Sequence, residues 1–476
     1  MSNINAIAII FSSILILGGT FLITSLINRK NTATEEDWAI GGRDLPIYVV
    51  IGTQFASCFG GGILVAQVGN AFSNGFSVLI YGFLVCFSFI IFMWFAKWLR
   101  NGNFTTIPDI LSHFSGKYSK RVIILGAIMA LVTPFGWIGS QVVAFGKLYS
   151  PMTGIEIHWL IIALCVVSVF FVMPAGMRTV AWTDFIFSVF ILLMCTIILI
   201  KAISMGGGPA EVYSNIPKEL ITFPDFVNKL GWGTAILWIF SVLPGNMTNQ
   251  LYYQRICAID NPKSVNKSLL LTAFFSFLGY VWACAMGLTI RTINPTLESE
   301  LATGWLMSQL PLILLAGFAG LLVATLMSTI SSAVQSVVVN ITTDIYPVIN
   351  SKATAEKTLK LSKVFTIIVL TVAAILSIRF PNVLDWFIYT YSFSAASLLC
   401  PIFVGYALRH KNMITEQGVF YSMLFGTLGC IVSLIIGLPI PEVIVGILAS
   451  LISLLVISAM TKGKNQMEIS AKVGES

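Results

Sequence analysis

The amino-acid sequence predicts an all-α polytopic membrane protein, from its composition, its apolar runs and the placement of its basic residues. Of 476 residues, 57% are hydrophobic and only 10% are charged, whereas a soluble domain is typically about 25% charged. The mean hydropathy is +0.90. So few charges could not cover a water-exposed surface, and the folded chain is therefore expected to face lipid.

Apolar runs of membrane-spanning length recur along the whole chain. A helix needs about 20 apolar residues to cross a bilayer. The sequence predicts about thirteen crossings, at residues 5–28, 46–71, 76–96, 121–146, 155–175, 179–203, 232–250, 267–290, 311–345, 361–379, 383–407, 416–437 and 440–461. The 311–345 run is too long for one straight crossing, so we expect it to project into the cytoplasm near Asp344.

The basic residues predict the orientation in the membrane. With the N-terminus outside and an odd number of crossings, 21 of the 27 Lys and Arg residues fall in cytoplasmic loops. Short cytoplasmic loops are typically rich in these residues. We therefore expect a multi-pass protein of the cell (inner or plasma) membrane with a cytoplasmic C-terminus. The net charge of +7 is explained in this way and does not indicate nucleic-acid binding.

The sequence contains no pattern typical of an enzyme or a metalloprotein. Its eight cysteines are scattered through apolar runs without a CxxC pair, and its three histidines are far apart. A phosphate-binding GxxxxGK[ST] loop is also missing, which argues against an ATP-driven pump. We expect no enzymatic activity, no transition metal and no cofactor.

Two predicted spans contain residues that interrupt a helix. The 46–71 span contains Gly60-Gly61-Gly62, and each glycine costs a helix about 1 kcal/mol relative to alanine. A break there would free backbone carbonyls to coordinate a cation, although close packing of small residues is the alternative. The 232–250 span contains Pro244-Gly245-Asn246 and is also expected to be broken.

The matching positions of these breaks predict two structural repeats. Each break lies in the first helix of a five-helix half, as in transporters built from inverted repeats. The predicted organisation is a leading helix and cytoplasmic loop (1–45), a first repeat (46–203), an external loop (204–231), a second repeat (232–407), and two trailing helices with a short cytoplasmic tail (408–476).

Hydroxyl side chains gather on one face of the 311–345 span. Thr325, Ser328, Thr329 and Ser332 follow the i, i+3, i+4, i+7 spacing of a single helix face. Oxygen ligands suit a hard cation such as sodium. The alternative is that these hydroxyls bond back to the preceding turn of their own helix.

Asp184 is the carboxylate that the sequence places well inside a span. A buried carboxylate in a membrane is costly and indicates a functional site, with a cation as its expected partner. The alternative is an interfacial aspartate paired with Arg178 or water. Asp385 lies at the start of its span and is not assigned a role.

The chain resembles the sodium/solute symporter family, which includes sodium/proline, sodium/galactose and sodium/sialic acid symporters and the high-affinity choline transporter. The resemblance covers essentially the whole chain. Its markers are Gly41-Gly42-Arg43-Asp44-Leu45-Pro46, Thr106-Ile107-Pro108-Asp109, Trp182-Thr183-Asp184, Gln254-Arg255 and Asp344-Ile345-Tyr346.

The resemblance implies two sodium sites. The family's general site would consist of the carbonyls of Ala56, Phe59 and Thr325 with the hydroxyls of Ser328 and Thr329. Thr325 stands where alanine is usual, but only its carbonyl is needed. A second site, as in the sialic acid symporters, would consist of Asp184, Ser328, Ser331 and Ser332.

The resemblance also implies a solute site at the broken helices but leaves the solute open. The candidate residues are Gly60, Ile63, Trp137, Asn246 and Asn249. No arginine lies within the apolar part of the 121–146 span, which argues against sialic acid. Trp137 could offer a cation–π face, yet Cys58 and Asn249 stand where the choline carrier has tryptophan. The aromatic residues expected of a proline carrier are also missing near residues 242–250. An amino acid, a quaternary amine and an organic acid remain possible classes.

The implied mechanism is sodium-coupled import of a small solute by alternating access. The expected partners are sodium, the solute and the lipid bilayer, and a monomer would suffice. One alternative is a proton-coupled or sodium-independent carrier of the same fold, in which Asp184 titrates. Another is a membrane sensor or scaffold with a transporter fold.

Overall fold

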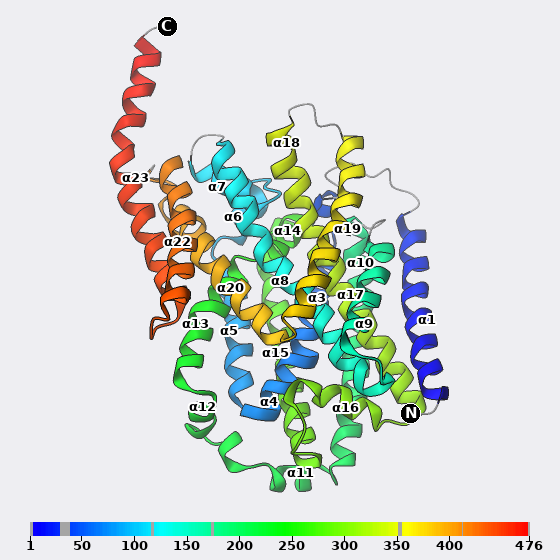
Figure 1. Ribbon diagram of the computed structural model, residues 1–476. Helices are drawn as coiled ribbons and strands as arrows, with labels where there is room; N and C mark the ends of the chain where they lie inside the picture. The colour runs from blue at the N-terminus through cyan, green and yellow to red at the C-terminus, as the bar shows by residue number, and fades with distance from the viewer. Residues whose placement is uncertain are drawn as a thin grey trace.

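The computed structural model describes residues 3–28, 39–115, 119–172, 176–350, 355–411 and 413–474, and these residues form a helical bundle (Figure 1). No strand occurs among them; Leu45 and Ile259 form an isolated bridge. A membrane offers no water to bond free backbone groups, so helices that satisfy their own groups are the expected structure.

The longer helices follow one another through the whole chain. They are α1 (Asn3–Asn28), α5 (Ser77–Phe92), α8 (Lys120–Thr153), α9 (Ile157–Val172), α10 (Met177–Met205), α13 (Trp232–Met247), α15 (Val265–Ile293), α17 (Leu312–Val339), α19 (Ala355–Arg379), α20 (Val383–Leu399), α22 (Glu416–Ile436) and α23 (Glu442–Gly474). Shorter helices connect them or extend them: α3 (Ile47–Cys58), η2 (Gly62–Gln67), α4 (Val68–Asn74), α6 (Ala96–Asn101), α7 (Ile107–Ser115), α11 (Pro209–Asn215), α12 (Asp225–Leu230), α14 (Gln250–Ala258), η5 (Ser299–Leu301), α16 (Ala302–Ser308), η6 (Asn340–Ile345), α18 (Tyr346–Ile349), η7 (Cys400–Val404) and α21 (Gly405–Leu408).

Every predicted span coincides with a helix or with a run of adjoining helices. Eight helices in the described ranges are long and apolar enough to cross a membrane, and a ninth span is a helix pair bent by 49°. The apolar parts of α1, α5 and α9 are shorter. The polytopic all-α fold is therefore confirmed, while the number thirteen and the inverted repeat stay predictions.

The first predicted break lies where the three glycines predict it. Helix α3 ends at Cys58, and the chain resumes as η2 at Gly62 before continuing into α4. The two parts meet at an angle of 49°.

The second break lies slightly later than Pro244-Gly245-Asn246. Helix α13 includes Pro244 and continues to Met247, because the Thr248 amide still donates to the Pro244 carbonyl at 3.0 Å. The Asn249 side chain then caps α14 by accepting from the Leu251 amide at 3.1 Å. This cap, more than the proline, determines where the next helix begins.

The predicted 311–345 span and the predicted 204–231 loop both have clear counterparts in the structure. Residues Leu312–Ile349 form one continuous helical segment of 38 residues, longer than a straight crossing needs. The 204–231 loop contains α11 and α12, which lie at the bottom of the molecule in Figure 1.

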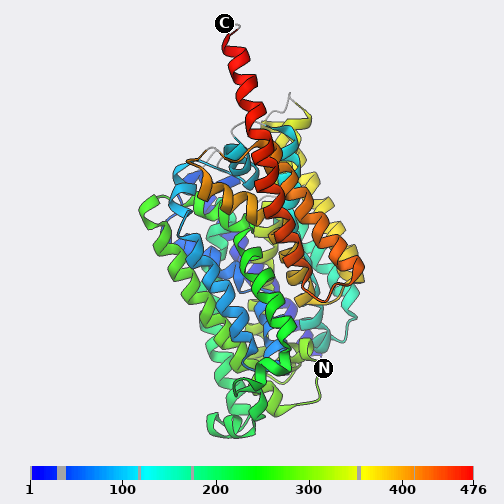
Figure 2. The same cartoon turned by 90° about the vertical axis from the view of Figure 1, so that its left-hand side faces the viewer.

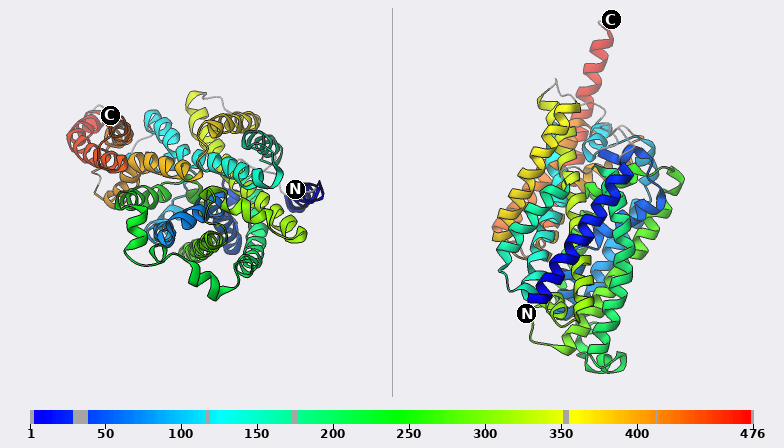
Figure 3. Two further views of the ribbon diagram at one scale, coloured as in Figure 1. Left: turned by 60° about the horizontal axis from the view of Figure 1, so that its bottom comes forward. Right: turned by 90° about the vertical axis from the view of Figure 1, so that its right-hand side faces the viewer.

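The ends of the described chain lie at opposite ends of the bundle (Figure 1), as an odd number of crossings requires. Helices α22 and α23 pack against each other on one flank (Figure 2). Helix α1 packs against α17 on the other flank (Figure 3). Between these flanks, α8 contacts both α17 and α20, while α10 contacts α3 and α17. The two breaks are thereby enclosed by helices.

Candidate functional site

The end of α3 is held against the hydroxyl face of α17. The Thr329 hydroxyl lies 3.2 Å from the Ser57 carbonyl and 3.1 Å from the carbonyl of Thr325 on its own helix. Because α3 stops at Cys58, carbonyls of its last turn have no partner further along that helix. Oxygen atoms of two helices therefore gather at the break.

Glycine at position 60 permits this close approach. A Cβ on Gly60 would lie 2.6 Å from the Thr329 hydroxyl oxygen and 2.3 Å from the Gln141 amide oxygen. The Gln141 oxygen also accepts from the Gly61 amide at 2.5 Å. The glycine run thus brings the chain into contact with both α8 and α17.

The residues of the first predicted sodium site lie on these two facing segments. Ala56 and Phe59 belong to the end of α3 and its cap, and Thr325, Ser328 and Thr329 belong to α17; all five are buried. The Thr325 hydroxyl donates back to the Leu322 carbonyl at 2.9 Å. The Thr325 hydroxyl is thus turned toward its own helix, and the family resemblance assigns only its carbonyl to the site.

Asp184 is surrounded by hydroxyl groups from two helices. Its carboxylate accepts from Thr53 at 2.6 Å, from Ser332 at 3.1 Å, and from Ser328. The Ser331 hydroxyl instead donates to the Ser328 carbonyl at 2.9 Å. The structure thus joins three of the four residues of the second predicted sodium site by hydrogen bonds: Asp184, Ser328 and Ser332. The fourth, Ser331, directs its hydroxyl to its own helix.

A buried arginine, Arg255 on α14, accompanies this carboxylate. One of its terminal nitrogens lies 3.6 Å from the Asp184 carboxylate, and the exposed fractions of the two side chains are 1% and 0%. Arg178, the alternative partner, instead forms an ion pair with Asp44 at 2.8 Å. The predicted spans leave Arg255 in the connection between residues 250 and 267, but α14 turns this side chain into the bundle.

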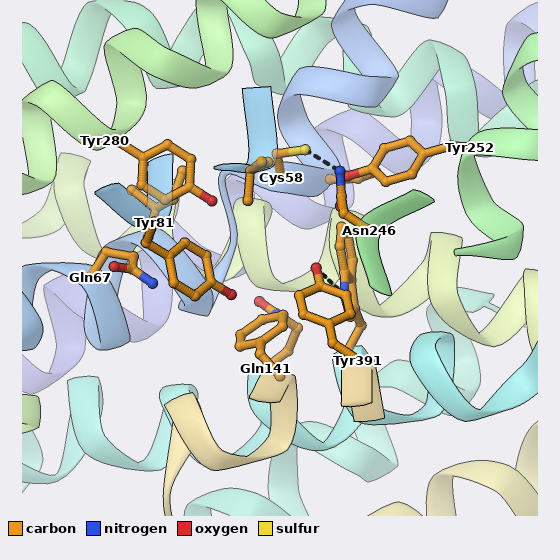
Figure 4. A pocket seen from close by; sticks show the side chains of 14 residues that line it. Cys58, Gln67, Tyr81, Gln141, Asn246, Tyr252, Tyr280 and Tyr391 are labelled. Carbon is orange, nitrogen blue, oxygen red and sulfur yellow. Dashed lines mark hydrogen bonds between the residues drawn. The ribbon is translucent and has the colours of Figure 1, made fainter. Parts of the chain in front are cut away.

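A cavity lies beside the two breaks (Figure 4). Its lining residues come from α3, η2, α5, α8, α13, α14, α15 and α20: Ser57, Cys58, Gly62, Ile63, Gln67, Tyr81, Val85, Trp137, Gln141, Asn246, Tyr252, Tyr280, Phe387 and Tyr391. The space between the atoms amounts to about 380 Å³, of which about 20 Å³ can take the centre of a water molecule. The cavity is therefore narrow in this conformation, and side chains must move to admit a solute.

The cavity is aromatic and polar, with no acidic or basic side chain among its lining residues. The hydroxyls of Tyr81 and Tyr391 and the amide of Gln141 point toward a common space (Figure 4). Tyr391 also accepts from the Trp137 indole at 3.2 Å. The amide oxygen of Asn246 is buried without a hydrogen-bond partner, while its nitrogen donates to Ser88 at 2.5 Å. A polar solute could satisfy that oxygen.

Three of the five predicted solute residues, Ile63, Trp137 and Asn246, line this cavity. Gly60 lies in the break beside it, and Asn249 caps α14. The tyrosines, Gln67 and Gln141 are not among the residues predicted from the sequence. Their only signal was an isolated polar group inside an apolar run, which does not distinguish a cavity wall from a packed interior.

Comparisons with known proteins agree with this architecture. The profile of the sodium:solute symporter family matches residues 38–426. The high-affinity proline transporter PutP of Bacillus subtilis (strain 168) is 24% identical, over 92% of this chain and 95% of its own. Sodium/proline symporter 2 of Staphylococcus saprophyticus is 23% identical, over 91% of this chain and 89% of its own.

Solved structures of transporters have a similar fold. A sodium-coupled sialic acid symporter in a substrate-bound outward-open state superposes with a TM-score of 0.82 at 16% identity, covering 96% of this chain and 98% of that one. Mhp1, a nucleobase-cation-symport-1 family transporter in a closed conformation, superposes with a TM-score of 0.57 at 14% identity, covering 89% and 94%.

The helical bundle, its broken helices and these matches define a membrane transporter. The chain belongs to the sodium:solute symporter family. It is accordingly a multi-pass plasma-membrane carrier that couples sodium to a solute, not an enzyme, and sodium is its coupling ion.

Proposed function

We propose that this carrier imports a small zwitterionic organic solute, with proline and related amino acids as the first candidates, together with sodium by alternating access. The observation that supports the proposal is the juxtaposition of the α3 break, the hydroxyl face of α17 and an uncharged aromatic cavity.

The sodium ion binds at the α3–α17 contact. The carbonyls of Ala56, Phe59 and Thr325 and the hydroxyls of Ser328 and Thr329 are its ligands. A site of neutral oxygens holds a hard cation weakly enough to release it in each cycle. The ion links the broken helix to α17, and so couples its own binding to the shape of the adjoining cavity.

The chemistry of the cavity favours a solute without net charge. No charged side chain lines it, so a free organic acid or amine would lack a counter-charge there. Six aromatic rings, those of Trp137, Phe387 and four tyrosines, can pack against an apolar ring or a substituted ammonium group. The two proline carriers among its relatives agree with a cyclic amino acid.

In the proposed cycle, sodium and solute enter from the side of the N-terminus, where α11 and α12 lie. Binding of both completes the contact between α3 and α17. The bundle then opens on the opposite side, where the C-terminus lies, and releases both into the cytoplasm.

Thermal unfolding of the purified protein tests the proposal. Proline, glycine betaine, choline, sialic acid and galactose are each added in sodium and in potassium. Selective binding to the folded state raises the melting temperature, so we expect proline or another zwitterion to stabilise in sodium and not in potassium. Equal stabilisation in both salts would contradict sodium coupling and favour the proton-coupled alternative. Stabilisation by choline alone would contradict the zwitterionic class.

A further inference from the structure

Hydrogen bonding fixes which end of the Asn246 amide faces the cavity. The amide nitrogen donates to the Ser88 hydroxyl on α5 at 2.5 Å. Ser88 donates its single proton to the Val85 carbonyl at 2.6 Å, so toward Asn246 this hydroxyl acts as the acceptor. Asn246 lines the cavity, whereas Ser88 is not among the lining residues. The nitrogen therefore faces α5, and the oxygen, at the other corner of the amide plane, faces the cavity side.

This oxygen is an acceptor without a donor. Asn246 is fully buried, and its amide oxygen has no hydrogen-bond partner in the described part of the chain. A buried acceptor that is left unpaired costs the free energy of its lost hydration. A solute that brings a donor to this oxygen recovers that free energy, and a solute without a donor does not.

Other residues of the cavity wall offer donors instead. The Gln141 oxygen accepts from a backbone amide, and its nitrogen gives one of its hydrogens to Ser140 at 3.0 Å and keeps the other. The Tyr391 hydroxyl accepts from an indole N–H and so keeps its own proton to donate. Both groups and the Tyr81 hydroxyl point toward a common space (Figure 4). Such a set of neutral donors suits a carboxylate, which only accepts.

We propose that Asn246 recognises the ammonium group of the solute, so that the carrier selects amino acids with at least one N–H and rejects zwitterions with a quaternary nitrogen. The inference rests on the proposed function and narrows its solute class. The N–H of the solute donates to the Asn246 oxygen, and its carboxylate accepts from the donors of Tyr81, Gln141 and Tyr391. Ser88 is a positioning residue, because it holds the amide in this orientation.

A series of methylated prolines tests the inference. Proline, N-methylproline and N,N-dimethylproline share the ring, the carboxylate and a net charge of zero, but their nitrogens carry two, one and no hydrogens. The half-saturating concentration of each is measured from the melting temperature of the purified protein in sodium. We expect the first two to differ by less than about threefold and N,N-dimethylproline to bind at least about tenfold more weakly than proline, because a site built for a hydrogen bond rejects the analogue that lacks it.

Two variants separate hydrogen bonding from the size of the methyl groups. Asn246→Leu keeps a side chain of similar volume without an acceptor, so the preference for proline over N,N-dimethylproline should fall below about threefold. Ser88→Ala lets the amide turn and should weaken proline binding about three- to tenfold. Ser268→Ala is the matched control. Ser268 also donates to the carbonyl three residues earlier, at 2.8 Å, but accepts from no side chain among the described residues, so this variant should bind proline like the wild type.

The outcomes separate the inference from the proposed function. Equal binding of the three prolines, equal losses at each methylation, or an undiminished preference in Asn246→Leu would overturn the role of Asn246 but leave sodium-coupled uptake of a zwitterion intact. If neither the three prolines nor glycine betaine stabilises the protein in sodium, the proposed function fails, and the inference fails with it. If the variants do not fold, the methylated series on the wild type still decides.

Discussion

Two threonines one turn apart on α17 use their hydroxyls differently. Thr329 reaches the Ser57 carbonyl of α3 at 3.2 Å as well as the Thr325 carbonyl of its own helix at 3.1 Å, whereas Thr325 bonds to the Leu322 carbonyl within its own helix. The sequence places both on the same helix face, and both offer oxygen atoms of the kind that bind sodium. Both hydroxyls bond back to their own helix, and only the contact of Thr329 with the neighbouring helix distinguishes the two.

Replacing each threonine by valine therefore has different expected effects. Thr329→Val removes a hydroxyl ligand and should raise the sodium concentration for half-maximal stabilisation at least about tenfold, which corresponds to about 1.4 kcal/mol. Thr325→Val keeps its carbonyl and serves as the matched control, with a change below about threefold. Equal effects of the two variants would contradict the assignment of Thr329 as a ligand.

The sequence predicts some residues of the site and not others, for physical reasons. Asp184 is conspicuous because a carboxylate inside an apolar run needs a partner. Its partner Arg255 looks like an ordinary loop cation, since α14 is too short and polar to read as part of a membrane helix. Tyr81 and Tyr391 have no distinguishing signal in the sequence, because a buried tyrosine at a cavity resembles one in a packed core.

At the scale of the elements, the broken helix depends on close backbone contacts. The Gly60-Gly61-Gly62 run predicts the break at the right place, since three glycines cannot sustain a helix in competition with the surrounding contacts. The second break is harder to locate from sequence. Pro244 is tolerated inside α13, and the cap supplied by Asn249 determines where α14 begins.

Adding one methyl group at the first break should impair ion binding. In Gly60→Ala the Cβ would lie 2.6 Å from the Thr329 hydroxyl oxygen and 2.3 Å from the Gln141 amide oxygen, so these two side chains must turn away from the break. We expect sodium-dependent stabilisation to be lost or strongly reduced. Gly233→Ala in α13 is the control, because nothing lies within 4 Å of its Cβ. If Gly60→Ala bound sodium normally, the α3–α17 contact would not be the ion site.

A largely buried ion pair links two further elements. Lys147 on α8 contacts Glu300 in η5, and their side chains are 6% and 15% exposed. Removing one partner of a buried pair costs about 3–5 kcal/mol, whereas an exposed pair contributes about 0–1 kcal/mol.

Lys147→Met should therefore lower the melting temperature by several degrees. Lys229→Met is the control, because Lys229 and its partner Glu219 are 35% and 58% exposed. This variant should change the melting temperature little. A similar shift in both variants would show that the Lys147–Glu300 pair has no special structural role.

At the scale of the whole molecule, hydropathy and charge predict most of the fold. The predicted spans coincide with helices because lipid leaves the backbone no other structure, and the loop cations agree with termini at opposite ends of the bundle. Hydropathy says nothing of how the helices pack, so the convergence of α3, α10, α14 and α17 around Arg255 could not be derived from it.

A carrier that moves one sodium ion with a neutral solute transfers one charge per cycle. A membrane potential of 100 mV supplies about 2.3 kcal/mol per charge, which corresponds to about 40- to 50-fold accumulation of the solute. Proteoliposomes with equal sodium on both sides and an imposed potassium diffusion potential would measure this ratio, once the thermal assay has identified a solute. Accumulation of more than about a thousandfold would require a second charge.

The cysteines of the chain differ in one respect that has an experimental use. Seven are buried, whereas Cys58 is partly exposed, lines the cavity and lies 3.0 Å from the Tyr252 hydroxyl. The native protein thus carries a single thiol at the place where a solute would sit. When the cavity opens to admit a solute, a methanethiosulfonate reagent should modify Cys58 selectively, and a bound solute should slow that modification. The rate of Cys58 modification in the wild-type protein would therefore report whether a solute is bound in the cavity, and no cysteine-free variant is needed.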